Sequence, residues 1–223
     1  MAAAHGVILR PEDSGYLVAV LDRMSLEGHN LTAIEGIDHG VDRHLADSVV
    51  ALALEELLRA DSICDIGSGG GFPGLVLGRL CPQAKVTLVE SERAKADWLV
   101  RASADSPNVR VVHDRSEHLA GRERESFDVV TARAVGSLPV VLELAAPLTR
   151  VGGSAVLWRT LNEASSDAQA EKAAQTLGFR HMRRVAVTPF AGAVRCLDVW
   201  EKRHLCPGKY PRRAGMAAKR PLA

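Results

Sequence analysis

The sequence has few of the residues that mark a secreted, disulfide-bonded or membrane-embedded protein. Only four of its 223 residues are cysteine, and they lack the close pairing that a zinc site or a small disulfide scaffold needs. Aromatic residues make up only 4%. No uncharged apolar run reaches the roughly 18 residues of a membrane span, and the N-terminus lacks the basic start and apolar stretch of a secretion signal. We therefore expect a cytoplasmic protein with reduced thiols, no metal site and no membrane association.

An excess of charge of one sign is also missing, since the net charge is +1. This argues against a protein whose whole surface binds nucleic acid. The charge is unevenly placed, however, because residues 203–223 contain six lysines and arginines and no acid, which leaves a net charge of about −5 on residues 1–202. The composition of 203–223 predicts a basic, flexible tail whose cations could contact phosphates and whose Tyr210 could stack on a base.

The hydrophobic pattern predicts an α/β fold. Apolar residues recur at helical spacing over 16–26 and 41–58, so two helices precede the first strand. Short β-rich runs then alternate with helical stretches, which is typical of a parallel sheet with helices on both faces. The expected strands are 62–66, 85–89, 109–113, 127–131, 154–158, 181–187 and 194–200. A helix is expected at 163–177, and the last two strands, separated by a short turn, should form an antiparallel hairpin at the sheet edge.

A glycine-rich loop follows the first expected strand, which ends at Asp65. Gly67, Gly69 and Gly71 allow the backbone to turn tightly and approach a ligand closely. A phosphate-binding P-loop would continue with Lys and then Ser or Thr, and a dinucleotide-binding loop would have glycine at position 72, where Phe72 stands. The spacing, with an acid before it, instead resembles the first motif of class I methyltransferases. We therefore expect S-adenosylmethionine to be contacted by Asp65, Gly67, Gly69 and Gly71.

Two further segments follow the second and third strands. Glu90 ends the second strand, where its carboxylate can accept hydrogen bonds from both ribose hydroxyls of a nucleoside; alternatively it caps the helix that begins at Ser91. Residues 114–118 follow the third strand. They are either a surface turn or the segment with which class I methyltransferases contact adenine.

Several motifs occur in the order found in the bacterial 16S rRNA guanine-N7 methyltransferase family, also known as RsmG or the glucose-inhibited division protein B family. The sequence resembles that family at residues 30–34, 43–45, 47–48, 65–74, 115–117, 131–134 and 209–213. It departs from the usual family pattern at Ser25-Leu26, at Arg159-Thr160 after the fifth strand, and at Ala217. The resemblance implies a Rossmann-like class I methyltransferase with a mostly parallel seven-stranded sheet. It divides the chain into a helical extension (1–60), a methyltransferase core (61–202) and the basic tail (203–223).

The resemblance also implies site residues. Phe72 joins Gly67 as a cofactor contact, Ser116 and Glu117 lie beside the adenine, and Arg133 holds the methionine carboxylate or positions the target base. The expected RNA contacts are Arg159, Lys209, Tyr210, Arg212 and Arg213. The implied partner of this monomeric enzyme is 16S rRNA, the small ribosomal subunit or its precursor, with the target guanine in a loop near the decoding site.

Methylation at guanine N7 explains why the sequence shows no obvious pair of catalytic acid and base residues. This nitrogen has an exposed lone pair and no proton to lose, so alignment and electrostatic stabilisation suffice. His44 and His113 are therefore given no role, and Arg133 is the one candidate for positioning. Two alternatives stay open: a class I methyltransferase acting on a small molecule or a protein, and a ribosome-associated nucleotide-binding module without catalysis.

Overall fold

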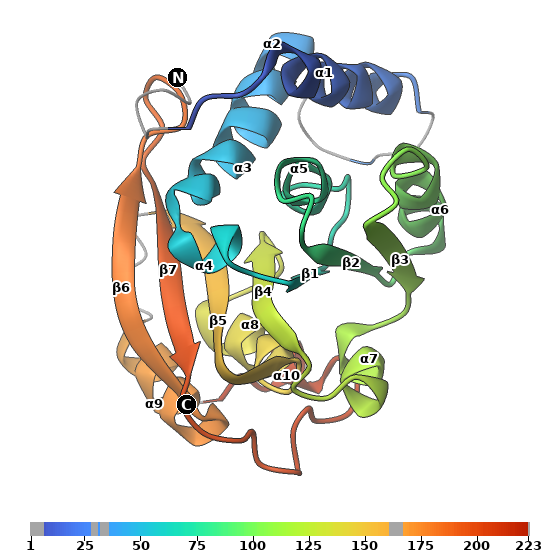
Figure 1. Cartoon of the computed structure of the whole chain (residues 1–223). Helices are drawn as coiled ribbons and strands as arrows, with labels where there is room; N and C mark the ends of the chain where they lie inside the picture. Colours follow the sequence, from blue (N-terminus) through green and yellow to red (C-terminus); the bar gives the residue numbers. More distant parts are fainter. Residues whose placement is uncertain (1–6, 28–30, 32–35, 161–166, 223) are drawn as a thin grey trace.

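A seven-stranded sheet lies at the centre of the computed structural model, which describes residues 7–27, 31, 36–160 and 167–222. The strand order is β3-β2-β1-β4-β5-β7-β6 (Figure 1). The strands are β1 (Ser62–Ile66), β2 (Lys85–Glu90), β3 (Val109–His113), β4 (Phe127–Arg133), β5 (Thr149–Thr160), β6 (Phe179–Val187) and β7 (Arg195–Lys202). Strands β1 to β5 pair in parallel, whereas β7 is antiparallel to both β5 and β6. The expected mostly parallel sheet with an antiparallel edge hairpin is confirmed.

The fifth strand is longer than the sequence pattern predicted. Gly152 and Gly153, which resemble a turn in the sequence, lie inside β5, and Gly152 has a φ of 80°. The pairing of β4 with β5 shifts in register between Phe127 and Val129. The glycines therefore allow an irregular start to the strand and do not end it.

The N-terminal extension is helical but more broken than expected. Helix α1 (Pro11–Ser25) begins earlier than predicted because a proline fits the first turn of a helix. The helical run starts before residue 41, with α2 (Ile37–Gly40). The single helix expected over 41–58 is divided into η2 (Val41–Ala46), α3 (Asp47–Val49), η3 (Val50–Ala53) and α4 (Glu55–Leu58). The break before α4 lies at Leu54, a buried residue with the extended ψ of 123°.

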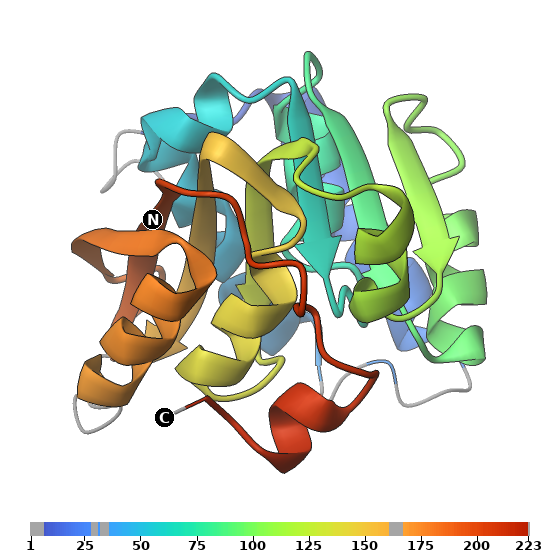
Figure 2. The same ribbon diagram turned by 90° about the horizontal axis from the view of Figure 1, so that it is seen from below.

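The remaining helices cover the two faces of the sheet (Figure 2). They are α5 (Gly74–Leu80), α6 (Arg93–Ala102), α7 (Ser116–Arg122), α8 (Leu138–Ala145), α9 (Asp167–Leu177) and α10 (Met216–Lys219). Helices α5 and α6 pack with the extension on one face, and α7 to α10 pack on the other. Residues 163–166 of the expected helix 163–177 lie outside the described residues. Within the described ranges, no helix is both long and apolar enough to cross a membrane.

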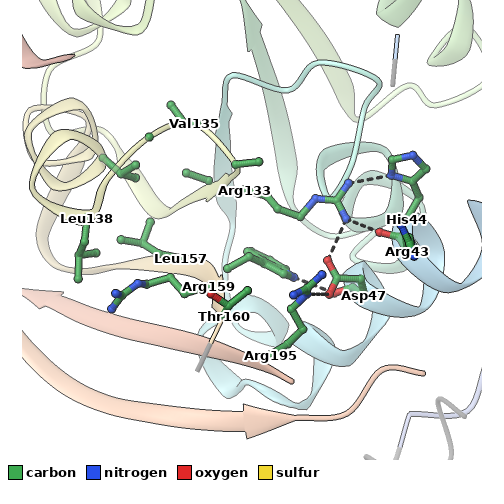
Figure 3. Close-up of a pocket in the computed structure, with 15 residues that line it drawn as sticks. Arg43, His44, Asp47, Arg133, Val135, Leu138, Leu157, Arg159, Thr160 and Arg195 are labelled. Carbon is green, nitrogen blue, oxygen red and sulfur yellow. Dashed lines mark hydrogen bonds and ion pairs between the residues drawn. The ribbon is translucent and has the colours of Figure 1, made fainter. Parts of the chain in front are cut away.

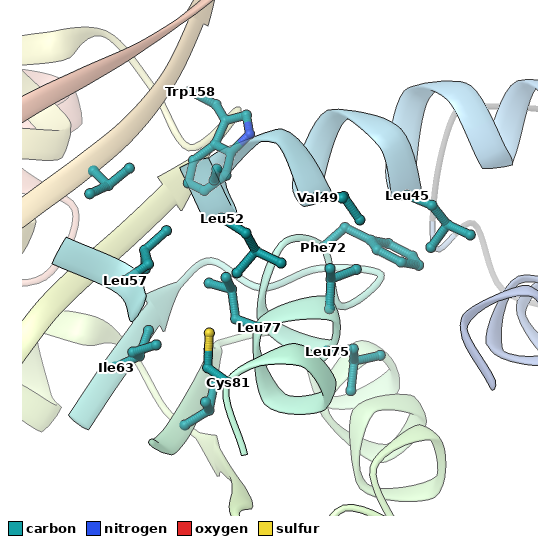
Figure 4. Close-up of a cluster of buried hydrophobic side chains, with 14 of the residues drawn as sticks. Leu45, Val49, Leu52, Leu57, Ile63, Phe72, Leu75, Leu77, Cys81 and Trp158 are labelled. Carbon is teal, nitrogen blue, oxygen red and sulfur yellow. The ribbon is translucent and has the colours of Figure 1, made fainter. Parts of the chain in front are cut away.

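The extension shares its hydrophobic core with the sheet. Leu17 of α1 and Val49 of α3 belong to the same buried cluster as Leu75 and Leu77 of α5 and Ile63 of β1 (Figure 4). Burial of side chains this large contributes about 1.5 to 3 kcal/mol each. The extension is therefore fixed to the face of the sheet that carries α5 and α6.

The C-terminal segment differs from the expected flexible tail. Cys206, Tyr210 and Ala217 are each at most 5% exposed and join the core cluster of α7 to α9. The composition of 203–223 suggested solvation because it shows six cations and no acids. It does not show that buried acids elsewhere, Glu117 and Glu143, accept hydrogen bonds from this segment.

Candidate active site

The glycine-rich loop lies between β1 and α5 at the carboxyl end of the sheet. The Gly67 N–H donates to the carbonyl oxygen of Val89 at 2.9 Å and so ties the loop to β2. Gly67 and Gly71 have φ values of 67° and 104°. A Cβ at Gly67 would lie 2.9 Å from Cγ2 of Val135, and one at Gly71 would lie 2.3 Å from Cδ1 of Leu75. Only glycine fits at both positions, so the main chain itself forms the wall of the site.

Asp65 lies beneath this loop and not in the open site. It is 1% exposed, and its Oδ1 accepts a hydrogen bond of 2.8 Å from the Thr131 hydroxyl. Burial raises the pKa of Asp65 to about 6, although the hydrogen bond from Thr131 works in the opposite direction. The expectation that Asp65 contacts the cofactor does not fit this position. Its carboxylate instead joins the ends of β1 and β4, from which the loop and Arg133 extend.

Glu90 at the end of β2 contacts the loop directly. One carboxylate oxygen accepts from the Gly69 N–H at 2.9 Å and the other from the Glu92 N–H at 2.8 Å. Glu92 immediately precedes α6, which begins at Arg93 and not at Ser91, so Glu90 contacts the residue before the helix and is not its N-cap. Each carboxylate oxygen has a second lone pair, which leaves the carboxylate able to accept hydrogen bonds from ribose hydroxyls as well.

A cavity of about 220 Å³ lies beside this loop. The residues that line it come from the ends of β1 and β2, the turn after β3, the start of α7, the segment after β4 and α8. They are Ile66, Gly67, Val89, Ser91, Asp114, Arg115, Ser116, Glu117, Val135 and Leu144. Ser116 and Glu117 thus border a cavity next to the glycine loop. Phe72 is not among these residues. Its ring stacks on His44, with 4.8 Å between the ring centroids and 18° between the planes.

A second cavity, of about 490 Å³, lies on the other side of the end of β4 (Figure 3). Its lining includes four arginines and one carboxylate, from η2, α3, β4, β5 and β7: Arg43, Asp47, Arg133, Arg159 and Arg195. Val135 lines both cavities. The two spaces therefore adjoin at the residues that follow β4, and the second one is basic.

Arg133 connects the end of β4 to the N-terminal extension. Its Nη1 donates to the carbonyl oxygen of Arg43 and to Oδ2 of Asp47, both at 2.9 Å, and its Nη2 lies 3.0 Å from Nδ1 of His44 (Figure 3). The Arg133 side chain is 16% exposed and that of Asp47 is 7% exposed. These three contacts use three of the five N–H donors of a guanidinium. The extension therefore fixes the direction in which Arg133 points.

His44 acts as a hydrogen-bond acceptor at this point. Because a guanidinium only donates, Nδ1 must carry the lone pair, and the neutral ring then has its proton on Nε2. Burial and, to a smaller extent, the positive charge of Arg133 lower the pKa of His44 to about 4. A neutral ring is thus the favoured form at ordinary pH.

The residues expected to contact RNA are in different environments. Arg159 is paired with buried Asp198 at 2.8 Å, with 7% of its own side chain exposed, although it lines the second cavity. The Tyr210 ring is buried, so the expectation that it stacks on a base does not fit this structure. Arg212 is paired with Glu143. Lys209 and Arg213 are exposed.

Sequence reasoning missed Asp47 and Arg195 as site residues. Asp47 lies in a segment that carried the family resemblance, but its sequence gave no sign that it would meet Arg133. Arg195 begins the antiparallel strand β7 and lies 3.7 Å from Oδ1 of Asp47 through its Nε. Only the pairing of β7 with β5 brings Arg195 to this cavity. Across the described residues, no three His, Cys, Asp or Glu side chains gather as a metal site would require.

Solved structures with a similar fold include methyltransferases. The fibrillarin pre-rRNA processing protein of Methanococcus jannaschii aligns with a TM-score of 0.59 at 14% identity, covering 80% of this chain and 87% of that one. Fibrillarin of Aeropyrum pernix, solved with bound S-adenosylmethionine, aligns with a TM-score of 0.55 at 15% identity, covering 70% and 73%. At these identities the likeness shows the fold, which is that of the class I methyltransferases.

Sequence relatives are closer. The family model described as GidB, rRNA small subunit methyltransferase G, matches residues 17–191. Proteins named ribosomal RNA small subunit methyltransferase G are 36% identical in Thermotoga neapolitana, covering 87% of this chain and 85% of the relative. The relative from Rubrobacter xylanophilus is 42% identical, covering 80% of this chain and 72% of the relative. The relative from Lacticaseibacillus paracasei is 35% identical, covering 99% of this chain and 95% of the relative. With its glycine loop, its paired cavities and these relatives, the chain belongs to the rRNA small subunit methyltransferase G family.

Proposed function

We propose that this protein transfers a methyl group from S-adenosylmethionine to N7 of a guanine in 16S rRNA. The observation that carries the proposal is the pair of adjoining cavities at the end of β4, which share Val135. One is bordered by the glycine loop and the start of α7. The other is lined by four arginines and suits a polyanion. A donor and an acceptor held in these two spaces would meet at the residues after β4.

The first cavity fits the cofactor. At Gly67 and Gly71 a Cβ would clash with Val135 and Leu75, so glycine is required for the path of this loop, and Glu90 presents a carboxylate beside it. Glu90 would accept from the ribose hydroxyls, and Ser116 and Glu117 would border the adenine. Bound there, S-adenosylmethionine supplies a methyl group on positively charged sulfur, a strong electrophile.

The second cavity would hold the target base. Guanine N7 needs no general base, and this cavity offers none that is poised: the Nδ1 lone pair of His44 accepts from Arg133, and the pKa of His44 is lowered to about 4. The residues would therefore act by placing the N7 lone pair in line with the methyl group. The N–H donors of Arg133 beyond its three contacts within the chain would bind the methionine carboxylate or O6 of the base.

The carboxylate of Asp47 has a specific place in this chemistry. Methylation of N7 leaves a positive charge on the purine, and four arginines near it would oppose that charge. Asp47 is the one carboxylate among the residues lining the second cavity. It would offset part of the repulsion as the charge develops, while it holds Arg133 in place.

RNA outside the pocket would be bound by exposed cations. Lys209 and Arg213 of the C-terminal segment are available for phosphate contacts, as is Arg43 at the cavity mouth. We propose that the protein acts as a monomer, in the cytoplasm, on the small ribosomal subunit or its precursor.

The test combines purified protein, radiolabelled S-adenosylmethionine and small subunits from a strain that lacks the gene. We expect label in 16S rRNA and one new site of chemical cleavage diagnostic of N7-methylguanine. Protein-free 16S rRNA in a parallel reaction identifies the preferred substrate, and the Glu90→Gln variant controls for contaminating activity. Label transfer with no new cleavage site would contradict the guanine-N7 assignment.

A further inference from the structure

Residues 206–215, here called the C-terminal strap, run across the sheet face that carries α7 and α8 (Figure 2). One guanidinium anchors its start. Arg124 donates to the carbonyl oxygens of Cys206 and Tyr210, both at 2.7 Å. The Tyr210 side chain is buried beside the helices of that face. The strap is therefore attached to the body by backbone and side-chain contacts before it reaches α7.

An ion pair fixes the middle of the strap to α8. Nε of Arg212 donates to Oε1 of Glu143 at 2.7 Å, and its Nη2 donates to Oε2 of the same carboxylate. The Glu143 side chain is 1% exposed. A buried carboxylate is costly without a partner, so Arg212 is needed for α8 to keep Glu143 at this position. The charge of Arg212 is thus used within the protein.

The end of the strap contacts α7. The Gly215 N–H donates to Oε1 of Glu117 at 2.9 Å, and Arg115 donates to the same carboxylate from the side of the preceding turn. Glu117 lines the 220 Å³ cavity, as does Leu144, the neighbour of Glu143 in α8. The strap therefore touches, from outside, the two helices that supply walls to that cavity.

We propose that the C-terminal strap is a positioning element of the S-adenosylmethionine site, in which Arg212 holds α8 and Gly215 holds the Glu117 carboxylate of α7. This inference rests on the proposed function, because it takes the 220 Å³ cavity to be the adenosine part of the donor site. It assigns the basic residue Arg212 to cofactor affinity, in place of the RNA contact that its charge suggested.

The expected effect on cofactor affinity follows from the fraction of molecules in which α7 and α8 are correctly placed as walls of the 220 Å³ cavity. If loss of one anchor leaves the wall ordered in roughly a tenth to a fifth of the molecules, the apparent Kd for the cofactor rises about five- to tenfold. Binding still involves one site per chain. The adenosine part alone should be affected as much as the whole cofactor, since the strap acts on the adenine side.

Isothermal titration calorimetry on the full chain tests this with two probes, S-adenosylmethionine and 5′-methylthioadenosine. The variants are Arg212→Gln, Glu143→Gln and the double variant. The control Lys219→Gln removes one exposed positive charge from the same C-terminal region. Filter binding with 16S rRNA is measured in parallel, and thermal melts identify variants that are folded at the assay temperature.

We expect Arg212→Gln and Glu143→Gln each to weaken both probes about five- to tenfold with unchanged stoichiometry. The double variant should be little weaker than either single one, because the pair acts as a unit. The rRNA affinity should change no more than in Lys219→Gln. Gly215→Ala provides a milder variant that should fold, since a Cβ there meets no atom within 4 Å while the φ of 79° strains the contact with Glu117. It should weaken both probes about two- to threefold.

A folded Arg212→Gln protein with wild-type affinity for both probes would overturn the proposal, as would equal losses in Lys219→Gln. If neither single variant folds, wild-type affinity in Gly215→Ala overturns it instead. Failure of the wild-type chain to bind S-adenosylmethionine at all would be a different result, because it would count against the proposed function itself.

Discussion

Replacement of Asp47 by asparagine removes the negative charge on which two arginines of the second cavity converge. Oδ2 of Asp47 accepts from Arg133 at 2.9 Å, and Nε of Arg195 lies 3.7 Å from Oδ1. The Asp47 and Arg133 side chains are 7% and 16% exposed, so water screens their interaction poorly. A hydrogen bond to a charged group is worth about 1.5 to 3 kcal/mol. If that energy is expressed as correct placement of Arg133, kcat/KM falls about 10- to 150-fold.

The direction in which RNA affinity changes in Asp47→Asn distinguishes a role of Asp47 in catalysis from a role in RNA binding. Without Asp47 the second cavity becomes more positive, so affinity for the rRNA polyanion should be maintained or increased. The loss should then appear in kcat, because the carboxylate no longer offsets the positive charge that develops on the purine.

The assay is methyl transfer to small subunits at varied subunit concentration, with filter binding of rRNA and a thermal melt for each protein. Asp42→Asn is the matched control, since Asp42 lies in η2 one turn earlier and does not line the cavity. It should leave kcat/KM within about twofold of wild type. An Asp47→Asn protein that is folded and keeps kcat within threefold of wild type would refute the assigned role.

Three further predictions concern the loop and the extension. Gly71→Ala should abolish measurable cofactor binding, because its Cβ would lie 2.3 Å from Leu75, whereas Gly69→Ala meets no atom closer than 3.8 Å and should retain weak binding; calorimetry distinguishes them. Glu90→Gln should raise the cofactor Kd about 10- to 150-fold in the same assay, because its amide loses an acceptor of ribose hydroxyls; an unchanged Kd would exclude the ribose contact. The pKa of His44 is lowered from 6.5 to about 4, so the unfolded chain takes up this proton first and stability should fall as the pH drops from about 6.5 to about 4. In urea unfolding, the free energy of unfolding should fall more between pH 6.5 and about pH 4 in wild type than in His44→Asn. An equal dependence on pH in the two proteins would contradict the prediction.

The central strands of the sheet were predictable because they are buried between two layers of helices. Parallel strands covered by helices contain nearly continuous β-branched and aliphatic runs, and β1 (Ser62–Ile66) and β3 (Val109–His113) have the predicted bounds. The start of β5 was not predictable, because Gly152 and Gly153 have the composition of a turn. The break at Leu54 within the helix expected over 41–58 was also missed, since the hydrophobic period alone does not reveal the extended backbone there.

The parts of the site that were predictable are those formed by main chain or by short local motifs. The glycine loop and the start of α7 border one cavity, and Glu90 contacts the same loop, as expected for local motifs at adjacent strand ends. Asp47 and Arg195 required knowledge of which segments meet across the sheet. The burial of Tyr210 and the pairing of Arg212 with Glu143 were not predictable for a related reason: the composition of a segment does not show which buried acids elsewhere in the chain it will meet.

Segments far apart in the sequence contribute to the neighbourhood of the central cavities, and this has a consequence for synthesis of the protein. Asp47 and His44 reach Arg133 across about ninety residues of sequence, and Gly215 reaches Glu117 across 98. Contacts so distant in sequence form only after most of the chain is available. A nascent chain whose residues 206–215 are still inside the ribosomal exit tunnel therefore lacks the last of these contacts, and we expect the donor pocket to be completed only when this segment has emerged.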